Sequence, residues 1–157
     1  MSNNLPTGPP PDRDAGAVLR ADRLAPRHAR ATVRRALTAW GLDSITTDAQ
    51  LLASELVANA VEHAEGAPIR LIVREQPAHD GQRGIICQIT DTAPTMPKPR
   101  HAQPDSERGR GLWIVAALAT DSGVTRHAHG KTAWFTLTSP ELAFDSLEAD
   151  YEAEASA

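Results

Sequence analysis

Cysteine is almost missing from the sequence, because Cys87 carries the single thiol among 157 residues. One cysteine excludes an intramolecular disulfide framework and a cysteine-rich zinc site, so we expect a reducing compartment. The apolar neighbours of Cys87 predict an inert core position rather than a nucleophile. Long apolar runs are missing too, and none approaches the ~20 residues that span a bilayer.

A positively charged, apolar leader is also lacking at the start of the sequence. We therefore expect no signal peptide, a cytoplasmic location and no membrane partner. The net charge is −4 at pH 7, from 16 Lys and Arg against 20 Asp and Glu, which argues against direct binding of nucleic acid. Lysine is scarce, since only Lys98 and Lys131 are present.

Three regions differ in composition, and the middle one is predicted to fold. Residues 1–14 contain four prolines and few apolar side chains, so burial cannot offset the entropy of ordering and a disordered arm is expected. Residues 141–157 carry six acids and no Lys or Arg, which predicts an acidic tail. Residues 15–140 are the predicted domain, and without the tail the chain has 16 basic against 14 acidic residues.

Hydrophobic periodicity predicts three helices and five strands within this domain. The helices run from about Pro26 to Trp40, from Thr47 or Asp48 to Glu65, and from about Gly111 to Thr120. The strands are Ala17–Leu19, Ile69–Glu75, Gly84–Thr90, Gly123–Ala128 and Lys131–Leu137, with a proline-rich loop over Thr92–Arg108. This order predicts an α+β fold, a two-layer sandwich with helices on one face of a mixed, mainly antiparallel sheet.

The second predicted helix carries the most informative polar side chains. Glu55 and Asn59 are four residues apart and lie ~40° apart around the helix, with His63 one turn further on. A carboxylate and an amide placed this way serve a hard cation and the water or hydroxyl beside it. The solvated face of an amphipathic helix gives the same pattern, so this helix alone leaves both interpretations open.

Further polar motifs follow in order along the chain. Asp91 ends an apolar strand, where its carboxylate either accepts a hydrogen bond from a ligand amino group or ends the strand in a turn. The segment Gly109–Gly111 stands directly before a predicted helix, where glycines allow close backbone approach and free N–H groups favour a phosphate. Thr132, near the start of the last strand, contacts a base edge or pairs across the sheet.

Together these segments resemble the nucleotide-binding core of the gyrase, Hsp90, histidine-kinase and MutL superfamily of ATPases. Glu55–His63 is similar to its N box, Asp91–Pro94 to its first glycine box, Gly109–Val115 to its second, and Gly130–Phe135 to its last strand. The resemblance covers residues 17–138 and implies a Bergerat-type ATP-binding fold. Within the superfamily the chain is most similar to the stand-alone anti-sigma-factor serine kinases.

The resemblance implies a role for each matched residue. Glu55 corresponds to the base that activates the attacking hydroxyl, and Asn59 to the protein ligand of Mg²⁺. Asp91 corresponds to the residue that binds the adenine amino group, with Thr132 close to the same base. The other implied nucleotide contacts are His63 at the polar rim, Pro94 in the first glycine box, and Arg108, Gly109, Arg110, Gly111, Leu112 and Lys131 around the phosphates.

The implied activity is ATP-dependent phosphorylation of a serine or threonine on an anti-sigma-factor antagonist, together with sequestration of a sigma factor. Relatives of this type also imply a homodimer. Thr92, Ala93 and Pro94 stand where the first glycine box has glycines. This departure favours an alternative function, a nucleotide-gated protein-binding module with little or no catalysis.

Two other groups of residues have competing interpretations. The first helix carries four arginines that form a solvated face or a docking surface for an acidic partner or a second copy of the domain, namely Arg27, Arg30, Arg34 and Arg35. Three histidines, His101, His127 and His129, could form a metal cluster. Because none has a second ligand at helical i, i+4 spacing, a metal site is the weaker interpretation.

Overall fold

The computed structural model describes residues 13–64, 66–77, 81–92 and 107–142. In chain order the elements are β1 (Asp14–Arg20), α1 (Ala25–Ala39), a short 3₁₀ turn η1 (Asp43–Ile45), α2 (Thr46–His63), β2 (Pro68–Pro77), β3 (Gln82–Asp91), α3 (Glu107–Leu118), β4 (Asp121–His127) and β5 (Gly130–Leu142). The predicted number and order of helices and strands are therefore confirmed.

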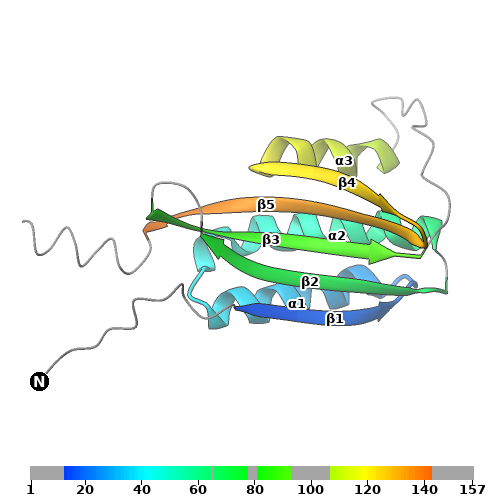
Figure 1. The fold of residues 1–157 in the computed structure, drawn as a ribbon, viewed down its shortest axis with the longest axis horizontal. Coiled ribbons are helices and arrows are strands. Elements are labelled where there is room, and N and C mark those ends of the chain that lie inside the picture. The colour runs from blue at the N-terminus through cyan, green and yellow to red at the C-terminus, as the bar shows by residue number, and fades with distance from the viewer. Residues whose placement is uncertain (1–12, 65, 78–80, 93–106, 143–157) are drawn as a thin grey trace, which may run out of the picture.

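The five strands form one sheet in the order β1-β2-β3-β5-β4, and helices α1 and α2 lie behind it (Figure 1). Every neighbouring pair is antiparallel, so the α+β two-layer fold is confirmed, while the expected parallel component of the sheet is absent among the described strands. Helix α3 contacts α2 and β4. Strands β3 and β4 run in the same direction, but β5 lies between them and pairs antiparallel with both, so no parallel pair forms among the described strands.

Strand alternation decides which side chains enter the core. Ile69, Leu71 and Val73 of β2 are fully buried on the helix side of the sheet, and their partners on β3 show the same alternation. Helix α1 presents Val33 and Leu37 to this core, and α2 presents a stripe of small and branched residues. No helix of the described residues covers the opposite face of the sheet (Figure 1).

Helix α1 begins and ends as its sequence predicts. Pro26 lies in the first turn, where a missing N–H costs nothing. At the other end Gly41 has φ +70°, and the N–H groups of Gly41 and Leu42 donate to the carbonyls of Thr38 and Leu37. These two bonds form a Schellman cap, which stops the helix and turns the chain toward η1.

The start of α3 differs from the prediction. The helix was expected from about Gly111, yet it begins at Glu107, so the glycines lie inside its first turns. A glycine costs about 1 kcal/mol in a helix but does not forbid one, and α3 compensates by burying Val115. Strand β5 also runs to Leu142, two residues past the expected domain end. No helix in the described ranges combines the length and apolar character needed to cross a membrane.

Candidate functional site

Helix α2 brings Glu55 and Asn59 to the same side, one turn apart, and each is half-buried. Their positions follow from the neighbours, because Leu52, Leu56 and Val57 are buried and fix the rotation of the helix. His63 lies in the last turn of α2 and is exposed. The structure therefore supports a polar pair at Glu55 and Asn59 and leaves His63 at the outer end of the helix.

Asp91 and Lys131 form a buried ion pair between β3 and β5. They are direct partners in the strand register, and Asp91 Oδ2 lies 3.1 Å from Lys131 Nζ. Asp91 is 2% exposed and Lys131 is 6% exposed. Although the distance is that of an ion pair, Nζ makes no hydrogen bond of good geometry with any described residue. The two opposite charges are thus close together and shielded from water, so their electrostatic interactions with the polar atoms of a ligand would be strong.

Gly130 makes this pairing possible. A Cβ added at Gly130 would lie 1.9 Å from the carbonyl oxygen of Asp91, far inside van der Waals contact. Only glycine lets the start of β5 approach the end of β3 this closely. Sequence reasoning did not assign Gly130 to the site, although a glycine directly before a charged residue at a strand start was the available signal.

Thr132 lies on the other face of the sheet from Asp91, because it is one position beyond Lys131 in the same strand. Its hydroxyl is 2.8 Å from Thr90 Oγ1 and 2.6 Å from His127 Nε2. Lys131, and not Thr132, is the cross-strand neighbour of Asp91, and the expected contact of Thr132 with the base stays a prediction.

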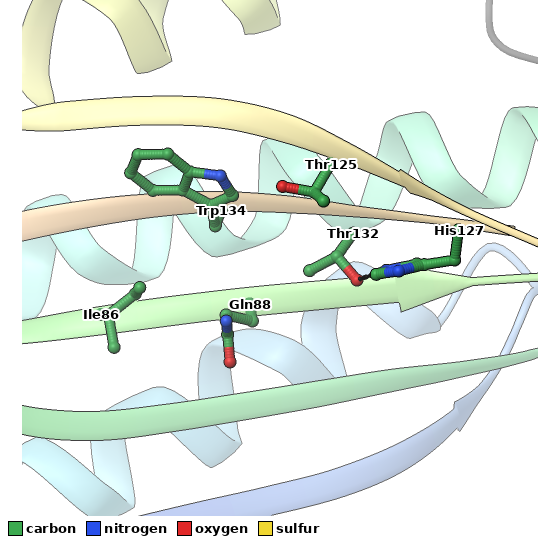
Figure 2. Close-up of a pocket in the computed structure, with 6 residues that line it drawn as sticks. All are labelled: Ile86, Gln88, Thr125, His127, Thr132 and Trp134. Carbon is green, nitrogen blue, oxygen red and sulfur yellow. Dashed lines mark hydrogen bonds between the residues drawn. The ribbon is translucent and has the colours of Figure 1, made fainter.

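Thr132 helps to line a hollow on the open face of the sheet. The other lining residues are Ile86, Gln88, Thr125, His127 and Trp134, and they come from β3, β4 and β5 (Figure 2). Its volume of about 230 Å³ is below the ~300–1,000 Å³ of ordinary ligand pockets. In the described part of the chain no three His, Cys, Asp or Glu side chains are placed to hold a metal, and His101 lies outside it.

The glycine segment meets the other motifs at one end of the molecule. The backbone from Arg108 to Leu112, including Gly109, Arg110 and Gly111, forms the first turns of α3, and α3 packs along α2. The beginning of α3, the end of β3 and the start of β5 lie at the same end, on the right in Figure 1. Pro94 lies outside the described residues. The described motif segments thus lie on α2 and α3, which pack together, and at the paired ends of β3 and β5.

Comparison with known proteins gives an independent view of this arrangement. The family model for the histidine kinase-like ATPase domain matches residues 19–137. The chain is also similar to the crystal structure of the RsbU and RsbW domains of Rv1364c from Mycobacterium tuberculosis, with 27% identity and a TM-score of 0.56. That match covers 83% of this chain and 33% of the longer one. The search of curated proteins found no match. Since the family model spans most of the folded domain, the chain belongs to the histidine kinase-like ATPase domain family.

Proposed function

We propose that this chain binds ATP with Mg²⁺ and phosphorylates a serine or threonine of a protein that antagonises an anti-sigma factor. The observation that carries the proposal is the polar pair Glu55 and Asn59 on α2, together with the buried carboxylate of Asp91, in a domain that matches the histidine kinase-like ATPase family. Similarity to a structure containing an RsbW domain supports the protein-kinase part of the proposal.

Each side chain has a distinct chemical task in this proposal. The buried carboxylate of Asp91 accepts a hydrogen bond from the adenine amino group. Asn59 is a half-buried residue, and its amide oxygen is a suitable ligand for a hard cation that keeps several waters, as Mg²⁺ does. When bound, the metal ion neutralises charge on the phosphate oxygens.

Glu55 is the proposed base for phosphoryl transfer. Its carboxylate takes the proton of the attacking hydroxyl, the hydroxyl oxygen forms a bond to the γ-phosphorus, and the bond to the ADP oxygen breaks. This reaction depends mainly on positioning and charge neutralisation, so the protein needs to supply only one basic carboxylate, held in place by a rigid helix. The first turns of α3, which contain Arg108 to Leu112, offer backbone N–H groups for the phosphates.

A second candidate is a nucleotide-gated binding module with little catalysis. Thr92, Ala93 and Pro94 follow Asp91 in place of glycines, which restricts how closely that backbone approaches a nucleotide. On α1, Arg27, Arg30 and Arg34 are exposed and offer a surface for an acidic partner such as a sigma factor, or for a second copy of the chain. In this function ATP binds without being turned over.

Calorimetry and a transfer assay separate the two candidates. We expect ATP with Mg²⁺ to bind the full chain and Asp91→Asn to abolish that binding. With labelled ATP and candidate antagonists, we expect transfer by the wild type and none by Glu55→Gln. Glu62→Gln is the matched control, because Glu62 is exposed on the same helix. Binding without transfer would favour the module, and absence of nucleotide binding would refute both functions.

A further inference from the structure

Lys131 is unusual because its ammonium group is buried. The side chain of Lys131 is 8% exposed, and among the described residues Asp91 is the acidic side chain that contacts Nζ. An ammonium has three N–H donors, and burying such a group is costly unless acceptors replace water. No described residue satisfies Nζ with a well-formed hydrogen bond. The site therefore holds donor capacity that the described residues do not use.

The position of this unused donor is defined by the fold. Asp91 and Lys131 are paired in the register of β3 and β5, and both project to the helix side of the sheet. A carboxylate that accepts and an ammonium that donates therefore stand 3.1 Å apart. Such a pair complements a ligand edge on which an N–H group adjoins a nitrogen lone pair.

Adenine has an edge of this kind. Its amino group donates, and the ring nitrogens N1 and N7 on either side of that group accept. Guanidinium groups and phosphates lack this alternation, since the former only donate and the latter only accept when ionised. The chemistry of the pair therefore points to the base of a nucleotide rather than to its phosphates.

We propose that Lys131 reads the base, donating a hydrogen bond from Nζ to the ring nitrogen beside the amino group that Asp91 binds. The inference rests on the proposed nucleotide site and deepens it. It moves Lys131 from the phosphate end, where the sequence placed it, to the base end. Lys131 is thus a specificity-determining residue whose effect depends on one ring nitrogen of the ligand.

Deaza analogues of ATP test this role without altering the protein. Calorimetry on the full chain would compare ATP with 1-deaza-ATP and 7-deaza-ATP, which each lack one flanking nitrogen. We expect one of these two to bind about 10- to 100-fold more weakly, the size of a hydrogen bond to a charged group. The matched control is 3-deaza-ATP, which lacks a nitrogen away from the amino group and should bind like ATP.

The variant Lys131→Met, measured with the same analogues, tests whether Lys131 is the residue that contacts the ring nitrogen. It should bind ATP more weakly and should no longer distinguish ATP from the sensitive analogue. Wild-type protein that binds ATP and both flanking-nitrogen analogues equally would overturn the inference and leave the proposed function standing. Wild-type protein that binds no ATP would instead refute the proposed function. If Lys131→Met does not fold, the wild-type comparison still decides.

Discussion

At the scale of single residues, the Asp91–Lys131 pair has a consequence for stability as well as for binding. Removing one partner leaves the other charge buried without compensation, so Asp91→Asn and Lys131→Met should each lower the free energy of unfolding by about 3–5 kcal/mol. The double variant is neutral and should recover most of that loss. Urea denaturation of the four proteins measures the coupling, and strictly additive losses would show that the charges do not interact.

Gly130 is predicted to be the least replaceable glycine among those with described surroundings. Gly130→Ala places a methyl group against the Asp91 carbonyl and must push β5 away from β3. Gly66→Ala is the matched control, because Gly66 has φ +79° and open space around it, so it should lose only about 1–2 kcal/mol of unfolding free energy. A loss at Gly130 no larger than at Gly66 would contradict the close approach.

Cys87 is predicted to be unreactive in the folded protein. Burial raises the pKa of its thiol well above the ordinary value, so the nucleophilic thiolate is not formed at neutral pH. A thiol reagent should react only as fast as the chain unfolds, and rapidly in urea. The unfolded state loses this proton at lower pH than the folded state, so the free energy of unfolding should fall as pH rises above the ordinary thiol pKa.

At the scale of elements, the sequence predicted most helices and strands because their apolar periodicity is strong. Helix α1 has a proline at its start, a glycine at its end and a continuous buried stripe between them. The face of the sheet on which Thr132 and Lys131 each lie could not be predicted in the same way. A shift of one residue in strand register exchanges the two faces, and register depends on pairing with β3 rather than on local sequence.

The position of the glycines inside α3 also leads to a prediction. Gly109→Ala and Gly111→Ala should each stabilise the helix by about 1 kcal/mol, because alanine is the better helix former. If the backbone approaches the phosphates there, the same changes should weaken ATP binding. Ala116→Gly is the control, since Ala116 is exposed in the same helix and its change should lower stability without altering ATP affinity. Unchanged affinity in both glycine variants would place the phosphates elsewhere.

At the scale of the whole molecule, the charge is unevenly distributed along the chain. Removing residues 143–157 takes away five carboxylates and no cation, while β5 keeps all its residues to Leu142. We expect this truncation to leave the midpoint of urea denaturation unchanged and to improve ATP affinity by at most about threefold at low salt. Any gain should disappear near 1 M salt, where the Debye length is ~3 Å. A large loss of stability would show that the removed segment belongs to the fold.

The three tryptophans lie in different surroundings, so their intrinsic fluorescence can report on different parts of the protein. Trp134 lies across Gly123, which has no room for a Cβ beside the indole, so this ring is held in one orientation on the open face. Trp113 is 76% exposed on α3, two residues after Gly111. Trp40 is half-buried where α1 ends. Quenching by a soluble agent should therefore act first on Trp113, which makes the intrinsic fluorescence of this chain a direct reporter of what happens to α3 when a ligand arrives.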